Sequence, residues 1–117
     1  MKRLMALAAL ILAVFWGAPA GARSGDLVVD YFRVDRDAQS TTIVGIAADR
    51  SAVYRYVGVR LNFDLYDAAG QLLGTESVTR PSVAPGESWN FKTEMGRTDV
   101  ASARIGGIEW DEQIAER

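Results

Sequence analysis

The sequence lacks cysteine and histidine altogether. Without cysteine the chain can form no disulfide, so the folded state depends on packing alone even in an oxidising compartment. Thiolate and imidazole chemistry are missing as well, which removes the usual activated nucleophiles and the common zinc and copper ligands. We therefore expect no bound metal and no cofactor.

Lysine is scarce, and the two that occur are Lys2 and Lys92. The net charge of the whole chain is −2, and it becomes −4 when Lys2 and Arg3 are left out with the first 22 residues. Nucleic-acid binding relies on clustered basic side chains that displace counterions. A mildly acidic chain with scattered arginines is therefore not expected to bind nucleic acid.

Long apolar runs are also missing, apart from residues 4–16, a run of 13 residues behind Lys2 and Arg3. A membrane-spanning helix needs about 20 apolar residues, so this run is too short to span. It is followed by two overlapping A-x-A sites, residues 18–20 and 20–22, which is the layout of a secretory signal peptide. We predict that residues 1–22 are a cleaved signal peptide.

Residues 23–117 would then be exported as a single domain, to the periplasm or the exterior. No cysteine follows the apolar run, so a lipid-modified N-terminus is not expected. Contact with the membrane would be transient, through the signal peptide only.

Residues 57–67 carry the clearest structural pattern of the chain. Apolar residues alternate with small, polar or amphipathic ones throughout, as expected of a long strand with one face in a core. Further strands are predicted over residues 27–34, 41–48, 71–78, 88–94 and 104–110, and residues 53–56 lead into the long strand. No stretch indicates an amphipathic helix of three turns, so we predict an antiparallel, immunoglobulin-like β-sandwich of about six or seven strands.

Glycine and proline mark the connections. Gly70 predicts a tight hairpin after the long strand, and Pro85-Gly86 predicts a type II turn. Pro81 and Pro85 are expected to bracket a loop. Gly45 indicates a bulge or a close backbone approach, and Gly106-Gly107 a bulge near a sheet edge. The charged tail from residue 111 to residue 117 is expected to fray.

The alternating run ends in the motif Phe63, Asp64, Leu65, Tyr66 and Asp67, followed by Ala68, Ala69 and Gly70. This motif resembles the one that names the FxLYD-domain family. The resemblance extends to residues 43–45, to the run 57–61, and to Pro85 and Gly86 ahead of Trp89 and Phe91. It covers roughly residues 27–108.

The resemblance implies a small extracytoplasmic sandwich of bacterial or archaeal secreted and surface proteins, without an established biochemical role. One position departs from the family pattern, since the chain has Asp49 where the family usually has asparagine. Both side chains can close a loop by bonding to backbone groups.

The motif itself has a folding explanation. Phe63 and Leu65 share the inward face of the long strand, and Tyr66 lies on the opposite face, where its ring can cover a neighbouring strand. Asp67 can accept backbone N–H bonds from the following turn. We therefore interpret the motif as structural rather than catalytic.

Catalytic and metal-binding alternatives fit poorly. A Ser-Lys pair would have to use Lys92, which alternates with Trp89 and Phe91 and so should face solvent. A carboxylate pair drawn from Asp64, Asp67, Glu76 and Glu109 would need a cleft that a small sandwich hardly provides. Residues 35–40 begin like a calcium loop but lack the glycine at its sixth position, which favours a polar turn. We expect no enzyme activity.

Aromatic residues remain as candidate binding groups. Tyr54, Arg55 and Tyr56 lie next to a predicted loop, and Trp110 lies near the C-terminus, where they could contact another extracytoplasmic protein. The alternative is that these rings fill the two sides of the sandwich. The sequence thus predicts a non-catalytic protein-binding or accessory module, with assembly through an exposed sheet edge as the alternative.

Overall fold

The computed structural model describes residues 23–116, and these form an all-β structure. The signal-peptide prediction for residues 1–22 lies outside the described residues. The strands are β2 (Arg23–Ser24), β3 (Leu27–Arg36), β4 (Thr41–Asp49), β5 (Tyr54–Tyr66), β6 (Leu72–Val83), β7 (Ser88–Met95), β8 (Ser102–Glu109) and β9 (Glu112–Ala115).

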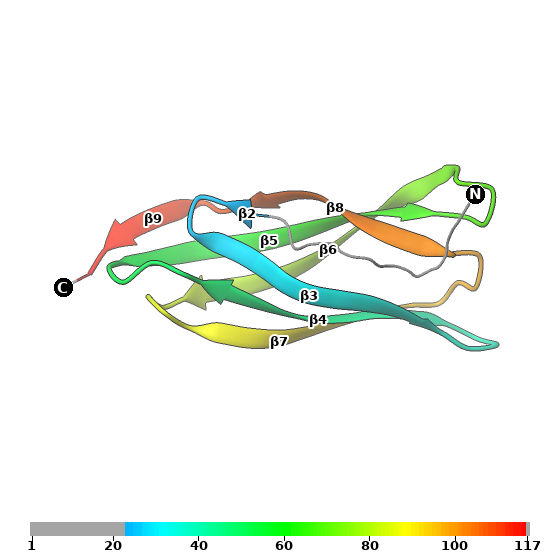
Figure 1. Ribbon diagram of the computed structural model, residues 1–117, viewed down its shortest axis with the longest axis horizontal. Helices are drawn as coiled ribbons and strands as arrows, with labels where there is room; N and C mark the ends of the chain where they lie inside the picture. The colour runs from blue at the N-terminus through cyan, green and yellow to red at the C-terminus, as the bar shows by residue number, and fades with distance from the viewer. Residues whose placement is uncertain (1–22, 117) are drawn as a thin grey trace.

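Two antiparallel sheets pack face to face, which confirms the predicted sandwich. One sheet has the order β2-β3-β4-β7, and the other has the order β6-β5-β8, with β9 also pairing with β5. The chain crosses between the sheets after β4, after β6 and after β7. The strands follow the long axis of a body measuring 48 × 25 × 19 Å (Figure 1).

The 13-residue strand β5 is the centre of the second sheet. At about 3.3 Å per residue it extends for roughly 43 Å, nearly the length of the molecule. From Val59 to Leu65 its inward side chains are fully buried, as the alternation predicts, and they share one core cluster with residues of β3, β4 and β7. The prediction is wrong for Val57, which is half-buried, because the alternation breaks at Gly58 with its φ of 70° and Tyr56 is the buried residue before it. Phe63 lies at the centre, with its ring 5.2 Å from that of Phe32 and 5.7 Å from that of Phe91.

Both predicted turns are present. Asp67 Oδ1 accepts the N–H groups of Ala69 and Gln71, each at 2.9 Å, and this closes the β5–β6 hairpin. The Glu87 N–H donates to the Ala84 carbonyl at 3.0 Å across Pro85-Gly86, where Gly86 has a φ of 75°. These values fit a type II turn.

Two other glycine predictions are also confirmed. A Cβ on Gly45 would overlap the Tyr31 carbonyl and the Phe91 ring, so β4 is approached closely there by its neighbours. In β8 the register with β5 shifts at Gly106, since Asn62 pairs with Gly107 and Phe63 with Ile105. The shift lies on the outer strand of the sheet, as expected of a bulge.

Two boundaries predicted from the sequence are wrong. Pro81 does not end β6 in a loop, because β6 continues to Val83 at the edge of its sheet. An edge strand tolerates a proline whose missing N–H would have faced away from its neighbour. The tail does not fray over residues 112–115, because β9 pairs with residues 54–57 of β5.

Candidate functional site

The four candidate binding residues lie together at one end of the sandwich. Tyr54, Arg55 and Tyr56 begin β5, where their partners are Ala115, Ile114 and Gln113 of β9. Trp110 lies in the short break between β8 and β9. In Figure 1 this end carries β9, and the β5–β6 hairpin is at the opposite end. The structure therefore brings together residues far apart in the sequence, but their exposures differ.

Tyr56 is a core residue. Its side chain is 0% exposed, so the proposal that it contacts a partner directly is wrong. Its hydroxyl donates to Asp26 Oδ2 at 3.1 Å and accepts from Gln113 Nε2 at 3.3 Å. Burial raises the pKa of this hydroxyl, which therefore stays protonated as a hydrogen-bond donor at neutral pH.

Trp110 is half-buried against Tyr56. The two rings lie 5.0 Å apart and nearly perpendicular, at 80°, an edge-to-face geometry favoured by aromatic pairs. The indole also lies beside Gly25 in the β2–β3 turn, where a Cβ would come within 3.2 Å of it. Trp110 thus packs on Tyr56 and Gly25 of the protein itself, and its indole covers this end of the core.

Arg55 bridges three strands on the outer face of the second sheet. Its Nε forms an ion pair with Glu116, just beyond β9, and its Nη1 donates to Ser82 Oγ of β6 at 2.6 Å. The side chain of Arg55 remains 34% exposed. Its hydrogen bonds are already used within the protein, so Arg55 is first of all a link between β9 and the rest of the sheet.

Tyr54 is the candidate that is accessible, at 36% exposure. Two further apolar residues at this end are more exposed, Val53 and Ile114, both at 42%. The sequence does not mark them as binding residues, because Ile114 lies in a charged tail and Val53 reads as the start of a strand. Residues 112–115 do not alternate between polar and apolar, so no local pattern predicts a strand there.

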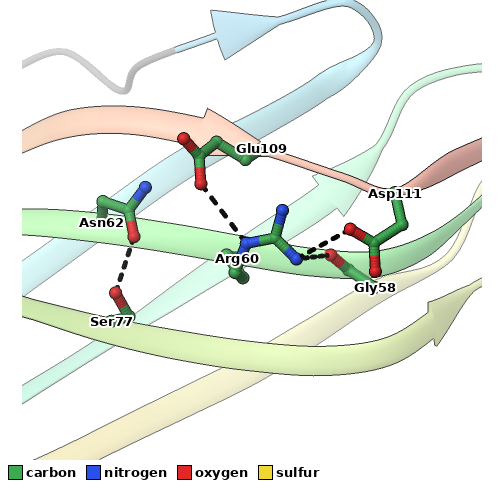
Figure 2. A network of polar contacts seen from close by, with 6 residues as sticks. All are labelled: Gly58, Arg60, Asn62, Ser77, Glu109 and Asp111. Carbon is green, nitrogen blue, oxygen red and sulfur yellow. Dashed lines mark hydrogen bonds and ion pairs between the residues drawn. The ribbon is translucent and has the colours of Figure 1, made fainter.

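The β8–β9 break is held by a network around Arg60 (Figure 2). Arg60 Nε donates to Glu109 at 3.3 Å, and Nη1 donates to Asp111 at 3.1 Å and to the Gly58 carbonyl at 2.9 Å. These bonds, led by the one to Asp111, raise the pKa of Arg60. Glu109 and Asp111 flank the break, so one guanidinium ties both strands to β5.

Gly58 makes this arrangement sterically feasible. It has a φ of 70°, and the Asp111 side chain occupies the place where a Cβ would be. The Asp111 N–H donates to the Val57 carbonyl at 2.8 Å, which carries the pairing across the break. The network therefore has a structural role, because Arg60 on β5 forms charge-assisted hydrogen bonds with the two carboxylates, Glu109 and Asp111, of the β8–β9 segment.

Among residues 23–116, Asp49 is the one buried carboxylate, at 1% exposure. Its Oδ1 accepts the Ser51 N–H at 2.8 Å, while its Oδ2 has no partner among the described residues. Burial raises the pKa of Asp49, with smaller contributions in the same direction from Asp26 and Glu87 and an opposing one from the Ser51 bond. Asp49 therefore holds the β4–β5 connection through its bond to the Ser51 N–H, and this costs the free energy of burying a carboxylate with one unpaired oxygen.

The carboxylates considered for catalysis do not converge. Asp67 caps a turn, Glu109 pairs with Arg60, and Glu76 lies on the edge strand β6. Residues 23–116 contain no group of three His, Cys, Asp or Glu placed to hold a metal ion. Lys92 is exposed, as the alternation of β7 predicts.

A shallow hollow lies where β5 and β6 separate. It has a volume of about 250 Å³ and is lined by residues 58–60 of β5 and 79–81 of β6. Sites that enclose a small molecule commonly measure about 300 Å³ or more and are mostly apolar. This hollow follows from the unpaired Gly58 and Pro81 in the β5–β6 register.

Within the described part of the chain, no helix is long and apolar enough to cross a membrane.

Searches against protein-family models, curated proteins and solved structures find no match to this chain. The resemblance to the FxLYD-domain family, carried by residues 63–67 and the turn that follows, stays a prediction.

Proposed function

We propose that the protein is a non-catalytic, extracytoplasmic binding module of FxLYD-like build, which contacts another exported protein through the β5–β9 end. The leader pattern of residues 1–22 supports export. The observation that carries the binding proposal is the grouping of Val53, Tyr54 and Ile114. They are three of the six large exposed apolar residues that the structure describes between residues 23 and 116, and all three lie on or next to the short β5–β9 pairing.

The chemistry of this end suggests the kind of partner. Ile114 pairs with Arg55 and Tyr54 pairs with Ala115, so the side chains of Tyr54 and Ile114 lie on opposite faces of the ribbon. A partner that receives the end of this ribbon in an apolar pocket contacts both faces, with Tyr54 as the main anchor, because tyrosine is among the residues that dominate interface energetics. Exposed Glu112 lies on the same ribbon, and Arg55 is already paired with Glu116. A basic rim around the partner's pocket would complement Glu112.

Affinity capture from an exported-protein extract tests the proposal, with the protein expressed as the full chain and used as bait. Tyr54→Ala and Ile114→Ala should each reduce capture of a discrete partner by about tenfold or more, as expected of interface anchors. Leu72→Ala is the matched control, because Leu72 is 61% exposed and lies in the distant β5–β6 hairpin. Thermal melts should be unchanged in all three variants.

Equal capture by Tyr54→Ala, Ile114→Ala and the control would show that this end is not the binding surface. Trp110→Ala is a poor probe here, because removing the indole exposes Tyr56 and weakens the fold itself. Turnover of any substrate by the purified protein would contradict the non-catalytic assignment.

A second candidate function is assembly through a sheet edge. The observation that favours it is strand β7, which ends the first sheet and keeps an unbroken register with β4 over all eight of its residues. An edge of this kind is a template for adding another strand.

A further inference from the structure

Strand β7 is the most regular edge of the described sandwich. It contains neither proline nor glycine, and its pairing with β4 has no register shift. Alternate backbone N–H and C=O groups of an edge strand point away from its neighbour. On β7 these outward groups meet no other strand within residues 23–116.

The other edges are interrupted. Strand β6 carries Pro81 and a register shift at Leu65/Tyr66, and β8 carries the shift at Gly106. Opposite β7 in the first sheet, β2 is only two residues long, and β3 beyond it has a shift between Val29 and Tyr31. Strand β9 is only four residues long. Bulges, prolines and shortness are three of the devices that prevent edge-to-edge pairing, and charged side chains such as Lys92 are a fourth, which an opposite acidic residue can satisfy. None of the first three devices is present on β7.

The side chains of β7 define what could pair with it. Trp89, Phe91 and Met95 point inward and are buried. On the outward face Lys92 and Glu94 are two residues apart, and both are exposed. Lys92 makes no hydrogen bond or ion pair with the described residues, and Glu94 accepts only from Ser40 Oγ, at 3.1 Å.

A second β7 strand is complementary to this face in one antiparallel register. If Thr93 lies opposite Thr93 on the two-fold axis, each Lys92 faces a Glu94 and each Phe91 faces a Met95. If the two-fold axis passes through Lys92, the two Lys92 side chains face each other, and if it passes through Glu94, the two Glu94 side chains do. If it passes through Phe91, each Lys92 faces an uncharged Asn90. Directly opposite pairs of unlike charge stabilise a sheet, and pairs of like charge destabilise it.

We propose that the partner of this edge is a second copy of the chain, joined β7 to β7 in the register that places Thr93 opposite Thr93. The β2-β3-β4-β7 sheets of the two copies then form one continuous sheet across the two-fold axis. The contact is isologous, so it closes at a dimer and does not propagate into a fibre. This inference rests on the second candidate function, assembly through a sheet edge, and specifies the edge and its occupant.

Sedimentation velocity over a concentration series tests the proposal, using protein expressed from the full chain. The native protein should show a monomer–dimer equilibrium. Lys92→Glu and Glu94→Lys should each weaken dimerisation by about tenfold or more, because two unlike pairs become two like pairs. The exchange variant Lys92→Glu/Glu94→Lys, which keeps the net charge, should restore the native dissociation constant.

Mixing provides a control that misfolding cannot imitate. The Lys92→Glu chain and the Glu94→Lys chain should dimerise with each other although each fails to dimerise alone, because the mixed interface regains both unlike pairs. Arg104→Glu makes the same charge change on β8 as Lys92→Glu makes on β7. It should leave the dimer intact.

A protein that stays monomeric at millimolar concentration overturns the inference, and so does a dimer that ignores both charge reversals. Hydrogen exchange separates this failure from failure of the broader function. If the β7 amides of a monomeric protein become protected on adding an exported-protein extract, edge pairing holds with another occupant. If they never become protected under any condition, assembly through β7 fails as well.

Discussion

The two ends of β5 close the same strand by different means. At the hairpin end, Asp67 bonds to backbone groups two and four residues further along the chain. At the opposite end, Tyr56 bonds to Asp26 and Gln113, which are 30 and 57 residues away. The hairpin is therefore a local structure, whereas the β5–β9 end exists only when three distant segments have come together.

The hairpin end can therefore form by itself, whereas the β5–β9 end forms only together with the rest of the protein. A local turn costs little loop entropy to form, while contacts across 30 or more residues are made only after the chain has largely folded. The candidate binding residues Tyr54 and Ile114 lie at the β5–β9 end. Their presentation to a partner thus relies on the integrity of the whole sandwich, and three pairs of variants can sharpen the comparison.

The largest difference is expected between the two tyrosines that flank the inward row of β5. Tyr56→Ala should lower the free energy of unfolding by about 3–5 kcal/mol, because it empties a fully buried site. Tyr66→Ala should cost about 1 kcal/mol, because this half-buried ring lies on the outer face, where the Arg104 guanidinium is 5.8 Å from its centre. Urea denaturation of both variants measures the two values, and equal losses would contradict the comparison.

A smaller difference is expected between two glycines with positive φ. Gly70→Ala should cost about 1–2 kcal/mol through backbone strain alone, because no atom lies near its Cβ position. Gly58→Ala carries the same strain and must also displace Asp111 from its bond to Arg60. We expect it to lose about 1 kcal/mol more.

The variants Asp111→Ala and Gly58→Ala/Asp111→Ala identify the cause of this excess in the same urea experiment. The difference between these two variants should be close to the loss caused by Gly70→Ala, because without the Asp111 carboxylate the Gly58→Ala change adds backbone strain alone. If Gly58→Ala costs no more than Gly70→Ala, the Arg60 network does not constrain β5.

The smallest effect concerns the buried carboxylate Asp49. Its pKa in the folded protein is raised by burial above the ordinary value of 3.8, so the folded state binds the proton more tightly than the unfolded chain does. Stability from this group therefore increases as the pH falls through the raised pKa toward 3.8. Asp49→Asn removes this dependence, so the variant should be more stable than the native protein at pH 7.

The stability gap between Asp49→Asn and the native protein should narrow steadily on acidification, as measured by thermal melts from pH 7 to pH 4. Asp49→Ala is the matched control, because it also loses the bond to the Ser51 N–H and should be less stable than Asp49→Asn at every pH. A gap that is constant with pH would show that the Asp49 pKa is not raised.

Strand prediction succeeded where local pattern and burial agree. The alternation of residues 57–67 predicts β5 and its inward row from Val59 to Leu65, but it places Val57 on the inward face where the structure buries Tyr56. Asp67, Gly70, Pro85 and Gly86 predict their turns, because turn chemistry acts within four or five residues. Pro81 misled the prediction of β6, since a proline is compatible with an edge strand and the sequence does not reveal which strand is at the edge.

The candidate site was predicted less well. Tyr54, Arg55, Tyr56 and Trp110 do share one end of the molecule, but adjacent strand residues point to opposite faces, and the sequence cannot say which face another segment covers. Tyr56 is buried because Asp26, Trp110 and Gln113 meet there. Ile114 was missed because its strand has a partner 59 positions earlier, at Arg55.

The sequence by itself determined the six longer strands, the tight turns and the inward row of β5 from Val59 to Leu65, because alternation and turn residues act over a few neighbouring positions. Only the tertiary structure decided that the charged tail is a strand, that Tyr56 is core while Tyr54 is accessible, and that β7 is the regular edge. These properties depend on which segments become neighbours in space, and burial and edge position are defined only by those neighbours.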